Sequence, residues 1–92
     1  MIKSIRHEGL RRYYETGSAS GVKADHRKTL RLQLTALDTA HSIDDLDIPG
    51  FRLHPLKGDR SGHWAIDVSG NWRLTFRFDG GDVHELDYED YH

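Results

Sequence analysis

The 92-residue chain contains no cysteine and no long hydrophobic run. Without cysteine there can be no disulfide framework, no thiolate zinc site and no thiol nucleophile, which is compatible with a reducing compartment. The apolar runs extend over only a few residues, too few to span a bilayer. The first ten residues, MIKSIRHEGL, also lack the apolar region of a signal peptide. We therefore expect a soluble cytoplasmic protein that does not act at a membrane.

Basic residues are missing from the last part of the sequence. Residues 79–92 carry six Asp and Glu and neither Lys nor Arg, a net charge of −6. Residues 1–78 carry 13 Lys and Arg against nine Asp and Glu, a net charge of +4. A basic body can attract phosphate groups, and the acidic part can pair with basic side chains beside it. On charge alone, however, an ordinary solvated surface is the favoured explanation.

Hydrophobic periodicity predicts two helices in the first 40 residues. Between residues 8 and 16 the apolar and aromatic side chains fall on one helical face, and Gly17 suits the position just after a helix end. The main helix is predicted over residues 25–40, with Asp25 as its N-cap. Its core face is formed by leucines that recur every three or four residues: Leu30, Leu34 and Leu37. Residues 1–7 are interpreted as a short first strand.

After residue 50 the pattern changes to that of strands. Four short runs, FRLHPL, HWAIDV, NWRLTFRF and VHELDY, have alternating or β-prone residues, and GN and DGGD between them are hairpin signals. Alternation places seven apolar residues on one side: Trp64, Ile66, Val68, Trp72, Leu74, Phe76 and Phe78. Arg73, Thr75 and Arg77 then point to the other side. We predict one α+β domain over residues 1–92, with two N-terminal helices packed on one face of a small antiparallel β-sheet.

The open face of this predicted sheet gathers groups that suit RNA cleavage. The candidates, from the first, third and last strands and their ends, are His54, Lys57, Arg73, Asp90, Tyr91 and His92. Arg and Lys bind phosphates, and imidazoles exchange protons near neutral pH. Metal-independent cleavage needs a base for the ribose 2′-OH, cations at the phosphate and an acid for the leaving 5′-oxygen. DNA lacks the 2′-OH and would resist this chemistry.

Each candidate also has a simpler structural explanation. A single histidine before a proline, as at His54, is more often a surface residue at a strand end than a catalyst. Arg73 can pair with Asp67 or Asp87 across the strands, and Lys57 can belong to a plain turn. The seven histidines suggest a metal site, but no two lie three or four residues apart. We therefore expect neither a metal site nor another cofactor.

The run FRLHPLKGDRSGHWAIDVSGNWRLTFRF followed by DYEDYH closely resembles the HigB group of the RelE-type toxins, the toxin halves of type II toxin–antitoxin pairs. The elements LHPLKG, GxWxIxV, NWRxTF and the terminal DYH carry the resemblance. It extends over nearly all 92 residues and is weakest in residues 17–23 and 41–49. Position 63, often aromatic in this group, is histidine here.

The resemblance implies a ribosome-dependent mRNA endonuclease that cuts codons in the A site, beside 16S rRNA, and arrests growth. A HigA-type helix-turn-helix antitoxin would restrain it. The catalytic positions of the group fall on His54, Asp90, Tyr91 and His92, and Lys57 and Arg73 would stabilise the phosphate. His92 and His54 would share the base and acid roles, Asp90 would orient an imidazole, and Tyr91 would stack on a base or relay a proton.

Two further functions remain open from the sequence. One is a non-catalytic nucleic-acid-binding module that acts as a co-repressor and contacts operator DNA only through an antitoxin complex. The other is an interaction domain that has lost its activity, although such a domain would be free to lose the catalytic set. The basic residues Arg27, Lys28 and Arg31 on the polar side of the main helix suit an electrostatic contact with ribosomal RNA.

Overall fold

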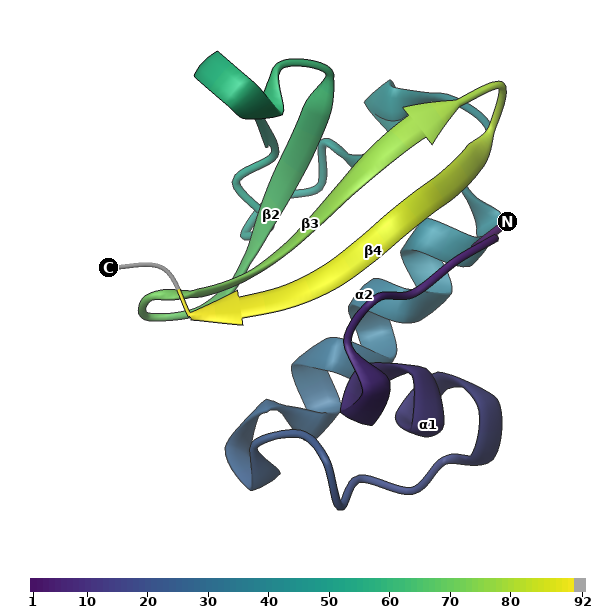
Figure 1. The fold of residues 1–92 in the computed structure, drawn as a ribbon, viewed down its shortest axis with the longest axis vertical. Helices are drawn as coiled ribbons and strands as arrows, with labels where there is room; N and C mark the ends of the chain where they lie inside the picture. The colour runs from purple at the N-terminus through teal and green to yellow at the C-terminus, as the bar shows by residue number, and fades with distance from the viewer. Residues whose placement is uncertain (91–92) are drawn as a thin grey trace.

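The computed structural model describes residues 1–90 (Figure 1). Along the chain the elements are α1 (Glu8–Thr16), α2 (Arg27–Thr39), β1 (His54–Pro55), β2 (His63–Ser69), β3 (Trp72–Asp79) and β4 (Asp82–Asp90). Single turns of 3₁₀ helix cover Ala24–His26, Ile43–Leu46 and Gly58–Arg60. The strands form one antiparallel sheet in the order β1-β2-β3-β4, and residues of both helices share its core, which confirms the predicted α+β architecture. Within residues 1–90, neither helix is long and apolar enough to cross a membrane.

Helix α1 has the ends that its sequence predicts. The Nδ1 of His7 accepts a hydrogen bond from the backbone N–H of Leu10 at 3.0 Å and so caps the first turn. Gly17 follows the last turn with φ 82°, a left-handed conformation that glycine adopts without a steric penalty. Leu10 and Tyr13 are buried in the core. Both the helix and its terminal glycine are confirmed.

The start of α2 differs from the prediction. Asp25 is not its N-cap, because this residue lies inside the 3₁₀ turn Ala24–His26, which continues directly into the α-helix. The start is held instead by His26, whose side chain is buried and whose Nδ1 lies 2.6 Å from the hydroxyl of Tyr88 on β4. The leucines of the predicted core face are buried as expected: Leu30, Leu34 and Leu37.

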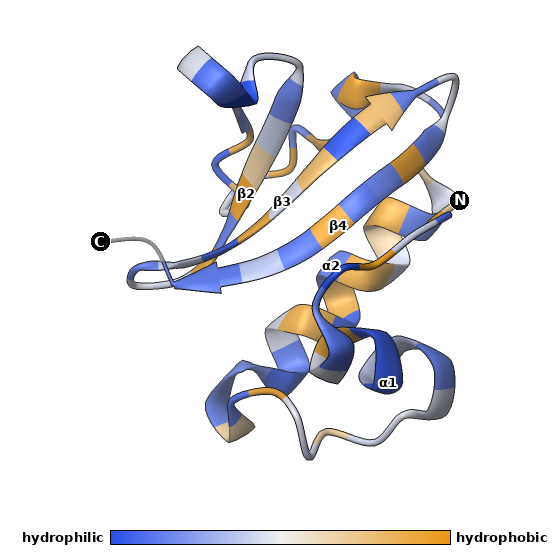
Figure 2. Ribbon diagram, viewed as in Figure 1, coloured by the Kyte–Doolittle hydropathy of each residue, from blue (hydrophilic) through white to orange (hydrophobic). Residues whose placement is uncertain are grey.

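The sheet separates its two faces largely as alternation predicts. Figure 2 shows apolar and polar residues alternating along β3 and β4. All seven predicted residues belong to the core or pack against it: Trp64, Ile66, Val68, Trp72, Leu74, Phe76 and Phe78. The opposite face is not fully open, however. Thr75 is completely buried there, because the guanidinium of Arg60 lies against its hydroxyl at 3.0 Å.

Residues 1–7, predicted as a first strand, pair with β4 but do not form a continuous strand. They run beside β4 (Figure 1) and form two isolated parallel bridges, from Ile2 to Val83 and from Ile5 to Leu86. Strand β1 is also shorter than the run FRLHPL suggests. The backbone of Arg52 is left-handed, with φ 55°, so extended structure begins only at His54.

Strand β4 contains one residue more than its partner. Thr75 pairs with Asp87, but Arg77 pairs with His84, so two β4 residues oppose one β3 residue. The extra residue is accommodated at Glu85, whose φ of 54° is typical of a bulge. The inward and outward positions of β4 are therefore exchanged beyond the bulge.

Candidate active site

A pocket of about 230 Å³ lies where β1, the β2–β3 turn and the start of β3 meet. Its lining residues are His54, Asp67, Gly70, Asn71, Trp72 and Arg73. Gly70 forms the turn with φ 55°, and the antiparallel register then brings Arg73 directly opposite Asp67. The fold thus brings two of the predicted site residues, His54 and Arg73, to one pocket.

The ring of His54 is held by the backbone just before it. His54 pairs with Ala65 of β2, and its Nδ1 lies 2.7 Å from the carbonyl oxygen of Arg52. A carbonyl oxygen can only accept a hydrogen bond, so Nδ1 is the donor. Proton exchange with a substrate is left to the other ring nitrogen, Nε2.

Arg73 lies between two carboxylates, Asp67 of β2 and Glu89 of β4, in the register of the sheet. The structure therefore supports Asp67 as a cross-strand neighbour of Arg73, whereas Asp87 is opposite Thr75. The carboxylate of Asp67 also contacts Arg52, with 3.4 Å between Nε and Oδ2. Arg73 is thus the central cation of this part of the sheet.

Glu89 is bound by a second arginine. Both terminal nitrogens of Arg60 donate to its carboxylate, at 2.9 and 2.7 Å, and the hydroxyl of Thr75 donates to the same group. These bonds from Arg60, opposed by partial burial and supported by Thr75 and by the charge of Arg73, lower the pKa of Glu89 to about 2. The same pair raises the pKa of Arg60. Glu89 therefore stays ionised and is neutralised by Arg60.

The cations around the pocket are largely matched by carboxylates. Arg52 contacts Asp67, and Arg60 is paired with Glu89 and also interacts with the charge of Asp87. Arg73 is the arginine among the described residues that line the pocket, so it is the group placed to meet a bound phosphate.

The remaining predicted residues are placed differently. Lys57 is exposed, precedes the 3₁₀ turn Gly58–Arg60, and is not among the described residues that line the pocket. Asp90 pairs with Trp72 at the end of β4, next to the pair of Arg73 and Glu89, and Trp72 and Arg73 both line the pocket. The membership of Asp90 in the catalytic set stays a prediction. Tyr91 and His92 lie outside the described residues.

Sequence reasoning missed the role of Arg60 and Glu89. Arg60 lies in KGDRSG, the run between the predicted strands FRLHPL and HWAIDV, and nothing in that run indicates contact with β4. A signal did exist for Glu89. Since Leu86 and Tyr88 are apolar and two residues apart, period-two alternation places Glu89 on the opposite face with the basic residues.

The β2–β3 turn is supported from the helix side by an aromatic cluster. The ring of Trp72 packs at 4.5 Å from that of Tyr88 and edge-on at 5.7 Å from that of His26, between ring centroids. Burial raises the pKa of Tyr88. The cluster fixes Trp72, and with it the backbone that carries Arg73. Trp72 therefore packs against the core, as alternation predicts, but it is only half-buried and also lines the sheet pocket.

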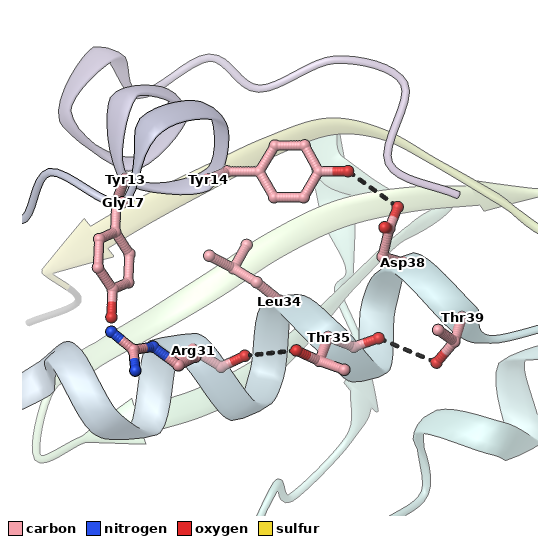
Figure 3. Close-up of a pocket in the computed structure, with 8 residues that line it drawn as sticks. All are labelled: Tyr13, Tyr14, Gly17, Arg31, Leu34, Thr35, Asp38 and Thr39. Atoms are coloured by element: carbon pink, nitrogen blue, oxygen red, sulfur yellow. Dashed lines mark hydrogen bonds between the residues drawn. The ribbon is translucent and has the colours of Figure 1, made fainter.

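A second hollow, of about 270 Å³, lies between α1 and α2 (Figure 3). The hydroxyl of Tyr14 donates to Asp38 at 3.0 Å, and the same carboxylate oxygen accepts the backbone N–H of Ile2. Burial and the bond to Asp38 raise the pKa of Tyr14, which makes it a poor proton donor to a ligand. No histidine is among its described lining residues, so we assign the candidate active site to the sheet pocket.

No group of three metal-ligating side chains comes together within residues 1–90. The site described so far therefore consists of an imidazole, a central arginine and the ion pairs that surround them.

Comparison with known proteins identifies the class. Residues 3–92 match the family described as RelE-like toxin of type II toxin-antitoxin system HigB. The fold agrees with this class of small α+β toxins. The sequence is also 50% identical to Endoribonuclease HigB of Proteus vulgaris over 92 residues, which are 100% of each chain. The chain therefore belongs to the HigB-like family of RelE-like toxins, and its partner is an antitoxin.

Proposed function

We propose that this protein is an endoribonuclease that cleaves mRNA on the ribosome and thereby arrests translation and growth. The observation that carries the proposal is the convergence of His54 and Arg73 on one pocket, in a chain half identical over its full length to a protein named an endoribonuclease. An imidazole beside a phosphate-binding cation is a sound basis for acid–base cleavage of RNA.

The proposed reaction uses the ribose of the substrate as the nucleophile. A base removes the 2′-OH proton, the 2′-oxygen forms a bond to phosphorus, and the bond from phosphorus to the 5′-oxygen breaks. An acid gives a proton to that 5′-oxygen. The products are a 2′,3′-cyclic phosphate and a 5′-hydroxyl. Arg73 would stabilise the negative charge on the phosphate through bidentate hydrogen bonds.

The other family positions complete the proposal. His54 and His92 share the base and acid roles, and Asp90 orients an imidazole. Tyr91 stacks on a base or relays a proton, and Lys57 adds a second cation near the phosphate. Because Lys57 lies on an exposed segment outside the pocket lining, we assign it the smaller contribution.

The proposed partners follow from the same family membership. The antitoxin is of the HigA type with a helix-turn-helix fold, and operator DNA is contacted only through the toxin–antitoxin complex. On the ribosome the protein meets mRNA and 16S rRNA in the A site, in the cytoplasm. The exposed basic residues at the start of α2, Arg27, Lys28 and Arg31, supply charge for such a contact.

The first test compares two histidine variants in a ribosome-dependent cleavage assay. His54→Ala should reduce the single-turnover rate roughly 10²–10⁴-fold, as expected for loss of an acid–base group. His84→Ala is the matched control, because His84 lies opposite Arg77 toward the far end of the sheet. Equal rates for the parent and both variants would show that the sheet pocket is not the active site.

The second test addresses the nucleophile. A message with a 2′-deoxy sugar at the scissile position should resist cleavage, and mass spectrometry of the normal product should find a 2′,3′-cyclic phosphate or its hydrolysis product. Cutting at the deoxy position, or a product with a 3′-hydroxyl, would refute attack by the 2′-OH.

A further inference from the structure

The residue that contacts His54 has an unusual backbone. Arg52 has φ 55°, in the left-handed region that side-chain-bearing residues seldom occupy. Its carbonyl oxygen is the atom 2.7 Å from Nδ1 of His54. Only one other described residue that is not glycine, Glu85 in the β4 bulge, has a positive φ. Such conformations cost free energy and persist only where neighbouring contacts impose them.

Contacts around Asp67 hold the Arg52 segment in place. The backbone N–H of Asp67 donates to the carbonyl of Phe51 at 2.8 Å, and its carboxylate contacts the side chain of Arg52. The carbonyl of Asp67 accepts a 2.7 Å bond from Gln33 of α2, a residue that is 1% exposed. Phe51 and Arg52, which lie just before the carbonyl that faces His54, are thereby tied to the protein core through Asp67.

The contact determines which ring nitrogen of His54 carries the proton. Because the carbonyl of Arg52 can only accept, neutral His54 is protonated on Nδ1 and has its lone pair on Nε2. His7 is held in the opposite way. Its Nδ1 accepts the backbone N–H of Leu10 at 3.0 Å, so neutral His7 is protonated on Nε2. The chain thus contains two histidines with opposite imposed tautomers.

We infer that Arg52 is a positioning residue whose left-handed backbone fixes His54 as the Nδ1–H tautomer and so makes Nε2 of His54 the base that accepts the ribose 2′-OH proton. The assignment of the base rests on the proposed nuclease function. The tautomer does not, because it is a property of the free protein. The side chain of Arg52 contributes only by its contact with Asp67, and the essential group is the carbonyl.

Imidazole ¹⁵N NMR of the free protein tests the tautomer directly. At about pH 8.5, where a histidine of ordinary pKa is neutral, His54 should show a protonated Nδ1 and an unprotonated Nε2, and His7 should show the reverse. His54→Ala assigns the signals. A protonated Nε2 on neutral His54 overturns the inference, whatever the protein does to RNA. If His54 shows the expected tautomer but the protein cleaves no mRNA, the proposed nuclease function is overturned and the inference about the tautomer stands.

Substitutions at the two left-handed positions test the role of the backbone. Arg52→Val places a β-branched residue where φ is positive, and the resulting steric conflict should displace the carbonyl of residue 52. His54 should then populate both neutral tautomers. The single-turnover rate of cleavage should fall roughly 10–100-fold, with little change in mRNA affinity. Glu85→Val imposes the same steric conflict in the bulge and should leave the tautomer and the cleavage rate as in the parent. Arg52→Gly removes the side chain but permits the conformation, so it should keep the tautomer and lose less activity than Arg52→Val.

Three results would overturn the inference in these variants. The first is an Arg52→Val variant in which the His54 tautomer and the cleavage rate are those of the parent. The second is a loss of cleavage rate in Glu85→Val as large as that in Arg52→Val. The third is an Arg52→Gly variant in which neutral His54 is protonated on Nε2, as His7 is. The His7 signals report in every sample whether the fold is intact. If Arg52→Val does not fold, the parent and Arg52→Gly spectra decide the question without it.

Discussion

Replacing Glu89 by glutamine tests the ion pair beside Arg73. The substitution keeps the approximate shape of the side chain and removes its charge, so Arg60 loses its carboxylate partner. Because the bonds from Arg60 lower the pKa of Glu89 from 4.5 to about 2, the ionised carboxylate stabilises the folded protein. We expect Glu89→Gln to lower the free energy of unfolding at about pH 7.

The size of this effect follows from the pKa shift of Glu89. Lowering the pKa of Glu89 from 4.5 to about 2 corresponds to at most ~3 kcal/mol of stability, at about 1.36 kcal/mol per pKa unit. The side chain of Arg60 is 37% exposed, so solvent screens the pair. We therefore expect a loss of about 1–2 kcal/mol.

The pH dependence has a defined sign. The pKa of Glu89 in the folded state lies below its unfolded value, so its contribution is fully present above about pH 4.5 and is lost as the pH falls through about 2. The difference in unfolding free energy between the parent and Glu89→Gln should therefore shrink by more than half between about pH 7 and about pH 3.

Urea unfolding of the parent, Glu89→Gln, Arg60→Ala and the double variant measures both the pH dependence and the coupling energy. Glu85→Gln is the matched control, because Glu85 bonds Arg77 on an exposed surface and its loss should have a smaller effect. A coupling energy between Arg60 and Glu89 below about 0.5 kcal/mol, or a difference that does not change with pH, would refute the reasoning.

Other substitutions test the site and the packing. Arg73→Ala should slow single-turnover cleavage more than Lys57→Ala, because a guanidinium can bind two phosphate oxygens, and the reverse order would overturn this ranking. Removal of residues 91–92 should abolish cleavage. It should leave the Tm nearly unchanged, because the described core is complete by residue 88. Cleavage at the parental rate by the truncated protein would contradict the proposed roles of Tyr91 and His92. Gly9→Ala should lower the free energy of unfolding by about 2 kcal/mol, because the added Cβ would lie 2.2 Å from the carbonyl oxygen of Gly21. Urea unfolding measures this loss. An unchanged urea midpoint would show that the backbone around Gly21 moves to accommodate the added Cβ.

Local patterns were sufficient to predict much of the fold. Gly17 ends α1 because few other residues adopt its conformation, and the glycine-containing turns join antiparallel strands as expected. The core face of β2 and β3 also followed from simple alternation, because their pairing is regular from His63 opposite Arg77 to Asp67 opposite Arg73. These features depend on contacts between residues that are close in the sequence, so residue types and their spacing are enough to predict them.

The features that local patterns could not predict depend on distant contacts. The bulge at Glu85 exchanges the faces of β4, so the position of Asp90 relative to Arg73 cannot be derived by counting from Val83. Asp25 has the character of an N-cap, but the buried bond between His26 and β4 favours a 3₁₀ entry. The convergence of His54 and Arg73 was predicted from their shared face of the sheet and also implied by the family resemblance, whereas the supporting ion pairs of Arg60 and Glu89 appeared only in the fold.

The outer edge of β4 is occupied by the protein's own first residues. The backbone N–H of Val83 donates to the carbonyl of Met1 at 2.9 Å, and that of Leu86 donates to the carbonyl of Ser4 at 3.0 Å. The segment beside β4 is visible in Figure 1. Polar backbone groups that would otherwise face solvent at this edge are therefore already hydrogen-bonded over residues 83–86.

The rest of the described sheet perimeter is closed in a similar way. Farther along β4, the backbone N–H of Tyr88 donates to the carboxylate of Asp87 at 3.0 Å. The opposite edge strand, β1, has only two residues, and Pro55 has no N–H to donate. Neither described edge offers the row of open amides that β-augmentation by another chain requires. A strand from another chain that paired with β4 over residues 83–86 would therefore first have to displace the segment that covers it.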